Sequence, residues 1–181
     1  MSKAKDKDLS LPPGDLALKE ALTEEGCPLC RLVREGEERW LWQLLYEFTG
    51  DPGVRGELDR ALGLCHAHAH LLIKVVEERE LIGGDGVARI YESIVRRYRR
   101  DLMGSGSAPN GPRPRRLPRK AGCPLCSRGQ ERELGLIHSL LKGLEDQEWG
   151  VSFKASDGLC NPHFLLALRE ADDPRIRGLL I

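Results

Sequence analysis

The feature that most constrains this chain is a pair of short cysteine motifs that occurs twice. The segment GCPLC spans residues 26–30 and again 122–126, and GLC followed by two residues and a histidine spans 63–68 and again 158–163. The first cysteines of the two motifs are 38 residues apart in the first copy and 37 apart in the second. Matched motifs at matched spacing indicate an internal duplication, which has to be recognised before other patterns are interpreted.

Each copy supplies three cysteines and one histidine, a donor set that suits a tetrahedral zinc ion. All six cysteines of the chain fall in the repeated motifs, which a role as small buried hydrophobes would not require. We therefore predict two zinc ions per chain. The predicted ligands are Cys27, Cys30, Cys65, His68, Cys123, Cys126, Cys160 and His163. An iron–sulfur cluster and metal-free thiol redox chemistry are the alternatives.

Three histidines compete for the ligand position in the first copy. Alignment of Cys65 with Cys160 places His68 opposite His163, so His68 is the predicted ligand. His66 and His70 are expected to face solvent, or to contact the metal ligands without binding the metal. His138 has no motif partner and is expected to be an ordinary surface or boundary residue.

The prolines in the motifs predict that every ligand pair opens a helix. Proline favours the first helical position, so Cys27 and Cys123 are the predicted N-caps of two helices and Asn161 that of a third. Amide groups and the dipole at a helix N-terminus favour negative charge. This suits three thiolates around Zn²⁺, which leave a net charge of −1.

The sequence leaves open which ligand pairs share a metal. We expect pairing within each copy, because pairing across the copies would require the segment between them to fix their relative placement. The alternative is an exchanged arrangement, in which Cys27 and Cys30 share a metal with Cys160 and His163.

Apolar residues that recur at steps of three and four predict an all-α fold. Such stripes lie over residues 29–48, 71–76, 87–102, 134–144 and 164–168, and no useful length alternates with period two. The expected organisation is two unequal repeated helical modules, each stapled by a metal site and joined by a flexible Arg/Pro/Gly linker. The expected boundaries are 1–14 (disordered N-terminus), 15–103 (first module), 104–121 (linker) and 122–181 (second, shorter module).

The net charge is zero, yet nine bases and one acid lie between residues 96 and 120. A nucleic acid is one possible partner of this region. The bases concerned are Arg96, Arg97, Arg99, Arg100, Arg113, Arg115, Arg116, Arg119 and Lys120. Tyr98 is expected in the core, because it lies on the apolar stripe of its helix. Acids such as Glu35, Glu37 and Glu38 are expected on a solvated helix face.

The basic N-terminus is followed by no apolar stretch typical of a signal peptide, and no segment approaches the roughly 20 apolar residues of a membrane span. We therefore expect a cytoplasmic protein without a membrane partner. Cysteines in that reducing compartment are more often metal ligands or redox groups than disulfides.

Several of these motifs together resemble a known family. GCPLC, the run LWxLLYEF, GLCxxH, a second GCPLC and GLCxPHF are similar to an uncharacterised bacterial family, family 6062 of the domains of unknown function, over approximately residues 15–168. The resemblance implies a helical, twice-repeated Cys/His protein with no established activity. The chain has no HExxH, GxSxG or phosphate-binding loop motif. The sequence therefore favours a non-enzymatic zinc protein, an interaction or regulatory module with a protein partner.

Overall fold

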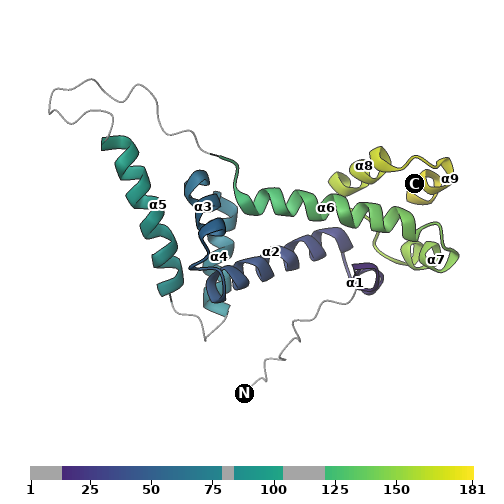
Figure 1. The fold of residues 1–181 in the computed structure, drawn as a ribbon. Coiled ribbons are helices and arrows are strands. Elements are labelled where there is room, and N and C mark those ends of the chain that lie inside the picture. Colours follow the sequence, from purple (N-terminus) through teal and green to yellow (C-terminus); the bar gives the residue numbers. More distant parts are fainter. Residues whose placement is uncertain (1–13, 79–83, 104–120) are drawn as a thin grey trace, which may run out of the picture. The chain divides into compact units, whose positions relative to one another are not determined.

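In the computed structural model, which describes residues 14–78, 84–103 and 121–181, all regular secondary structure of these residues is helical (Figure 1). The helices are α1 (Gly14–Ala21), α2 (Pro28–Tyr46), α3 (Pro52–Ala61), α4 (His66–Glu78), α5 (Asp85–Met103), α6 (Pro124–Gly143), α7 (Gln147–Ala155), α8 (Asn161–Glu170) and α9 (Pro174–Leu180). The prediction of an all-α fold is confirmed.

The five predicted apolar stripes lie on α2, α4, α5, α6 and α8. The other four helices have seven to ten residues and were not predicted from an apolar stripe, and capping signals mark three of them. Asp51 caps α3 by accepting a hydrogen bond from Val54 N, and Asp173 caps α9 by accepting one from Arg175 N. A proline follows each of these two aspartates at the start of the helix, where it fits best.

The helices form two compact units, and each unit is described by itself. Of the described residues, one unit contains those up to Glu35 together with Glu131–Ile181, and the other contains those within Gly36–Gln130. The boundaries fall inside α2 and α6, so each of these long helices contributes residues to both units. This division differs from the consecutive modules expected from the repeats.

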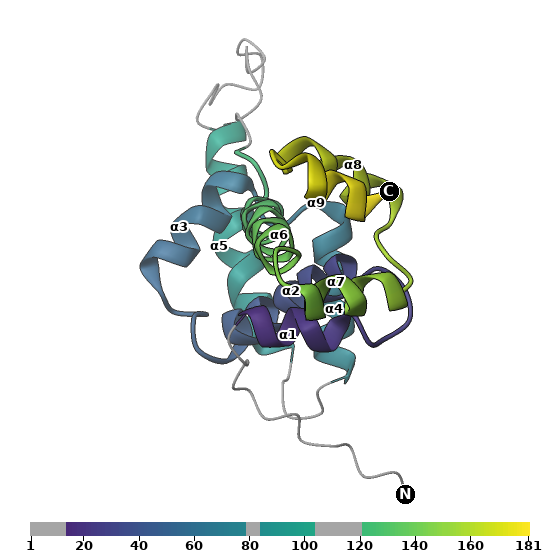
Figure 2. The same ribbon diagram turned by 90° about the vertical axis from the view of Figure 1, so that its right-hand side faces the viewer.

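The unit that includes the C-terminus has a core of leucines and small residues. Leu18, Leu29, Ile137, Leu140 and Ala167 are fully buried in it. In this unit α1 and α7 lie side by side (Figure 2), joined by an ion pair of 3.1 Å between Lys19 Nζ and Glu148 Oε2. α9 packs against α8.

The second unit has its own core, formed by the second half of α2, by α3, α4 and α5, and by the start of α6. Leu41, Leu44, Leu58, Leu72 and Leu125 are fully buried there. α5 packs on α3 (Figure 1). The two cores together explain why a chain with few aromatic residues folds, since apolar burial is the main favourable term in folding.

One expectation about the core is wrong. Tyr98 is 41% exposed although it follows Ile90 and Ile94 at steps of four along the same side of α5, because the last described residue of that side in the core is Ile94. The expected disordered segment 1–14 (apart from Gly14, which opens α1) and the expected linker (apart from Ala121) lie outside the described residues. The same holds for Arg113, Arg115, Arg116, Arg119 and Lys120. Within the described part of the chain, no helix is long and apolar enough to cross a membrane.

Candidate metal centres

Each of the four ligand pairs opens a helix in the same way. The carbonyl of the first cysteine in each pair accepts the first hydrogen bond of the helix, over 2.8–3.3 Å. The residues concerned are Cys27 (bonded by Arg31 N), Cys65 (Ala69 N), Cys123 (Ser127 N) and Cys160 (Phe164 N). The second ligand lies three residues further on, on the same helix face. The prediction that Asn161 caps α8 is wrong, because Cys160 is the N-cap and Asn161 is already helical.

A glycine that precedes each of three of these helices has its backbone in the left-handed region. Gly26 has φ 82°, Gly63 has φ 93° and Gly158 has φ 72°. A residue with a Cβ atom is strained in this region. The motif glycines therefore let the chain turn sharply before the ligands.

The first centre gathers Cys27, Cys30, Cys160 and His163. His163 Nδ1 lies 3.4 Å from the Sγ atoms of both Cys27 and Cys30, and 3.1 Å from Cys160 Sγ. Cys30 Sγ and Cys160 Sγ are 3.5 Å apart. His163 is buried, and all four residues belong to one unit.

The second centre gathers Cys65, His68, Cys123 and Cys126 in the other unit. His68 Nδ1 lies 3.2 Å from Cys65 Sγ, 3.4 Å from Cys123 Sγ and 3.5 Å from Cys126 Sγ. Cys65 Sγ and Cys126 Sγ are 3.7 Å apart. His68 and Cys123 are buried. The two centres therefore have the same donor set and nearly the same dimensions.

These dimensions fit a tetrahedral metal ion. With metal–sulfur and metal–nitrogen bonds of about 2.3 and 2.0–2.1 Å, the edges of the tetrahedron are roughly 3.5–3.8 Å long. The distances given above run from 3.1 to 3.7 Å, and the four donor atoms of each group lie within 4.8 Å of one another. All eight predicted ligands are thus brought together in two groups that could each hold one metal ion.

The expected pairing within each copy is wrong. Each group joins the CPLC of one copy to the CxxH of the other. The physical reason is the course of the two long helices, α2 and α6. α2 has 19 residues and runs from the unit that holds its CPLC into the other unit, which holds α3 and the CxxH of the same copy. α6, with 20 residues, does the reverse, since α7 and the CxxH of the second copy belong to the C-terminal unit.

Hydrogen bonds from backbone amide groups also join the region of each CPLC motif to the residues that precede the CxxH of the other copy. Gly26 N donates to Asp157 Oδ2 over 2.6 Å, next to Cys27 and just before Cys160. In the other unit, Ala121 N donates to the carbonyl of Arg60 over 3.1 Å. The two ligand pairs of each centre are therefore also held together by hydrogen bonds that do not involve the metal-binding atoms.

A carboxylate contacts the outer nitrogen of each ligand histidine. Glu37 Oε1 lies 3.0 Å from His68 Nε2, and Glu133 Oε1 lies 2.8 Å from His163 Nε2. A proton on Nε2 leaves Nδ1, which faces the three thiols, free to bind a metal. Metal-binding histidines commonly donate to such a carboxylate, which fixes the ring and raises its basicity.

Sequence reasoning missed both carboxylates. Glu37 was expected on a solvated face, but its side chain is only 19% exposed because it is turned toward His68. Glu133 was not singled out. The signal was present, since each glutamate stands ten residues after the first cysteine of its own CPLC. Gly129 leaves room for one of them, because a Cβ atom there would lie 2.9 Å from Glu37 Oε1.

The thiols within each centre differ in acidity. Burial raises the pKa of Cys27, but hydrogen bonds from backbone groups of Cys160, Cys30 and Leu29 outweigh it and lower the pKa to about 7. For Cys30, burial and the neighbouring Cys160 and Cys27 raise the pKa to about 12.

The second centre repeats this arrangement. Burial, Cys65 and Cys123 raise the pKa of Cys126 to about 12. Burial also raises the pKa of Cys65 and Cys123, but backbone hydrogen bonds bring both below the usual value. Three thiolates at this spacing repel one another, and a bound cation would remove that cost.

The remaining histidines lie where they were expected, outside the two groups. His66 and His70 are exposed on α4, with ring centroids 4.5 Å apart. His138 is a surface residue whose Nε2 lies 3.5 Å from Glu170 Oε2.

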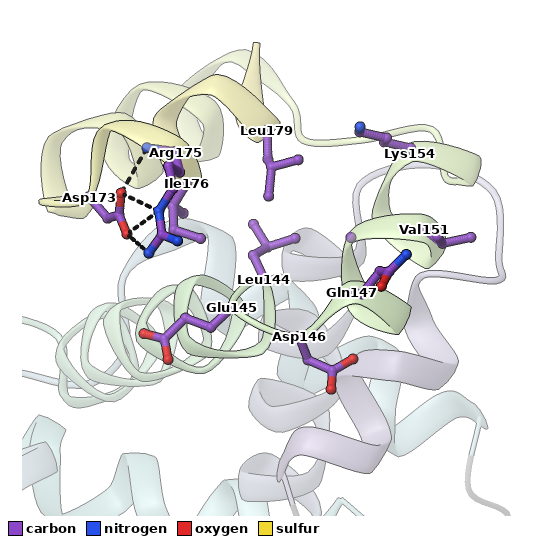
Figure 3. A pocket seen from close by; sticks show the side chains of 11 residues that line it. Leu144, Glu145, Asp146, Gln147, Val151, Lys154, Asp173, Arg175, Ile176 and Leu179 are labelled. Atoms are coloured by element: carbon purple, nitrogen blue, oxygen red, sulfur yellow. Dashed lines mark hydrogen bonds and ion pairs between the residues drawn. The ribbon is translucent and has the colours of Figure 1, made fainter.

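A pocket of about 640 Å³ lies in the C-terminal unit, between the end of α6, α7 and α9 (Figure 3). Leu144, Ile176 and Leu179 line its apolar part, and the exposed Asp173–Arg175 ion pair lies at its rim. The pocket has no cysteine or histidine among its lining residues.

Comparisons with known proteins add a family but no activity. Residues 15–175 match the model of a family of unknown function, DUF6062. Neither a curated protein nor a solved structure matches the chain.

Proposed function

We propose that this chain, which belongs to the DUF6062 family of unknown function, is a non-enzymatic zinc protein. Its two zinc ions would stabilise a helical interaction or regulatory module. The observation that carries this proposal is the closed donor set of each centre, with four protein donors within 4.8 Å of one another. Structural zinc sites are closed in this way, whereas catalytic ones keep a position open for water or substrate.

The carboxylates support a structural role. Glu37 and Glu133 approach His68 and His163 on the nitrogen that faces away from the thiols. They would hold the histidines in place from the side of each ring that faces away from the thiols. Zinc would supply a cross-link between two helix N-termini in each unit. In small domains such sites contribute about 10–16 kcal/mol of apparent binding free energy, comparable with the whole stability of a domain.

The spacing of the donor atoms also favours one ion over an iron–sulfur cluster. Edges of 3.1–3.7 Å leave room for a single ion bound at about 2.3 Å and not for several metal and sulfide atoms. Three thiolates with one histidine suit zinc among the common divalent ions. All six cysteines are free thiols, which agrees with a protein of the reducing cytoplasm.

Metal analysis of the purified chain tests this function. We expect two zinc ions per chain, falling to one in Cys65→Ser and to one in Cys160→Ser. Removal of both ions with a chelator should reduce the helical circular dichroism signal, since structural zinc and folding are coupled. His66→Ala is the matched control and should keep two ions. A chain that binds no metal, or one that binds iron with a visible absorbance band, would overturn the proposal.

A further inference from the structure

The C-terminal half of α5 leaves a basic and aromatic face uncovered. Val95 is 61% exposed and Tyr98 41% exposed. Three exposed arginines, Arg96, Arg99 and Arg100, stand at helical spacings of three and four. We call Val95, Arg96, Tyr98, Arg99 and Arg100 the α5 face, which extends around roughly half of the helix from Tyr98 through Val95, Arg99 and Arg96 to Arg100.

The core of the unit lies closer to the start of α5 than this face does. The helix is anchored by Ile90 and Ile94, which are buried in the core two turns and one turn before Tyr98. Ser93 adds a hydrogen bond of 2.8 Å from its hydroxyl to Asp59 Oδ1 of α3. Beyond this anchored part, Val95 and the three arginines are exposed and Tyr98 is only partly covered.

The charges of the α5 face are only partly compensated. Arg96 forms an ion pair of 2.6 Å with Glu92. Among the described residues, neither Arg99 nor Arg100 has an ion-pair partner. Arginines near a helix C-terminus also interact favourably with the helix dipole, but the dipole does not account for the exposed Tyr98.

We propose that the α5 face binds single-stranded nucleic acid. The arginines would contact successive phosphates, and the Tyr98 ring would stack on a base. Guanidinium groups match phosphate geometry, and a basic surface with an aromatic platform is the usual device for binding single strands without sequence preference. The proposal does not depend on the metal centres having a particular metal.

A membrane surface is less well matched to the α5 face. A helix that binds at a bilayer interface inserts a broad apolar side into the lipid. The broad apolar side of α5, which includes Ile90 and Ile94, is already buried against the protein. Only Val95 and Tyr98 would remain for insertion.

The test is fluorescence anisotropy of the metal-loaded full chain with a labelled single strand of about 20 nucleotides, longer than a typical binding site. Affinity should fall steeply between about 50 and 200 mM salt, since each phosphate contact to a single strand adds about 0.7 to the slope of log affinity against log salt. Arg99→Ala combined with Arg100→Ala should therefore lower the slope by about 1.4. Tyr98→Ala should weaken binding by roughly fivefold to a hundredfold, and Tyr98→Phe should not.

The matched control is Lys142→Ala combined with Lys154→Ala, which removes two exposed charges from the other unit. It should leave the slope unchanged. Metal content and helicity are measured for every variant, so that unfolding is recognised. The proposal is overturned if the wild-type chain does not bind the strand at about 50 mM salt. It is also overturned if the lysine control lowers the salt slope as much as the arginine double variant does, or if Tyr98→Ala binds as tightly as Tyr98→Phe. Binding to anionic lipid vesicles without binding to the oligonucleotide would overturn it as well.

Discussion

Glu37 Oε1 lies 3.0 Å from His68 Nε2, although the two residues come from different helices and are 31 positions apart. The contact assigns the ring proton to Nε2 and leaves Nδ1 for the metal. Its repeat counterpart, Glu133 with His163, has the same geometry at 2.8 Å. α2 thus begins with thiols of the first centre and carries the carboxylate of the second, and α6 does the reverse.

Replacement of Glu37 by Gln should weaken metal binding at the second centre by about 10–100-fold, the usual cost of losing such a carboxylate. The glutamine can still accept the hydrogen bond, so the loss reports the negative charge that raises the basicity of His68. Competition with a chromogenic chelator would show one weakened and one unchanged site per chain.

Glu133→Gln provides the reciprocal experiment and should weaken the first centre alone. Glu77→Gln, an exposed acid on α4, should change neither site. If Glu37→Gln and Glu77→Gln gave equal affinities, the contact with His68 would have no role in metal binding.

Gly129→Ala should also weaken the second centre, although alanine is the better helix former by about 1 kcal/mol. The added Cβ atom would stand 2.9 Å from Glu37 Oε1 and push the carboxylate away from His68. The effects of Gly129→Ala and Glu37→Gln should therefore be less than additive in the double variant. Gly135→Ala on the same helix meets no atom within 4 Å and should leave metal binding unchanged; chelator competition measures all four proteins.

The repeat and the helical periodicity were sufficient to predict the all-α fold and to choose His68 over His66 and His70. Both depend on local patterns. The motifs indicated which cysteines and histidines are candidate metal ligands. The apolar stripes indicated which helix faces are buried, as for Leu41 and Leu44 of α2.

The pairing of the motifs could not be predicted, because it depends on α2 and α6 each running from one unit into the other. The apolar stripes on these helices are local patterns and do not show that one helix contributes to two cores. Glu37 was expected on a solvated face for the same reason, since its partner His68 comes from another helix of the same unit. The exposure of Tyr98 depends on how far along α5 the core extends, because Tyr98 shares its side of the helix with the buried Ile94.

The pairing across the copies can be tested with double variants. Cys27→Ser combined with Cys160→Ser removes two donors from the same centre, so one zinc ion should remain per chain. Cys27→Ser combined with Cys65→Ser damages both centres, so no tightly bound zinc should remain. Pairing within each copy predicts the opposite result for both variants, and mass spectrometry of the intact protein under native conditions distinguishes the two arrangements.

Gly143→Ala should destabilise the C-terminal unit by about 1–3 kcal/mol, the usual cost of overpacking. A Cβ atom at Gly143 would lie 2.5 Å from Trp149 Cε3, and the ring packs against the core and cannot simply move aside. Urea denaturation followed by Trp fluorescence measures the change in unfolding free energy. Gly150→Ala, which meets no atom within 4 Å, is the control. A gain in stability from Gly143→Ala would contradict the packing described for Trp149.

Metal binding should release protons and weaken as the pH falls. The pKa of Cys30 and of Cys126 is raised to about 12 by burial and by neighbouring thiols, so both groups hold a proton near neutral pH before metal binds. A metal ion binds the thiolate, and each of these protons must then leave.

Each released proton makes the metal affinity fall about tenfold for every pH unit of acidification. Isothermal titration calorimetry in two buffers of different ionisation enthalpy counts the protons, and we expect at least one per zinc ion at pH near 7. Identical heats in the two buffers would show that the thiols were already ionised in the metal-free protein.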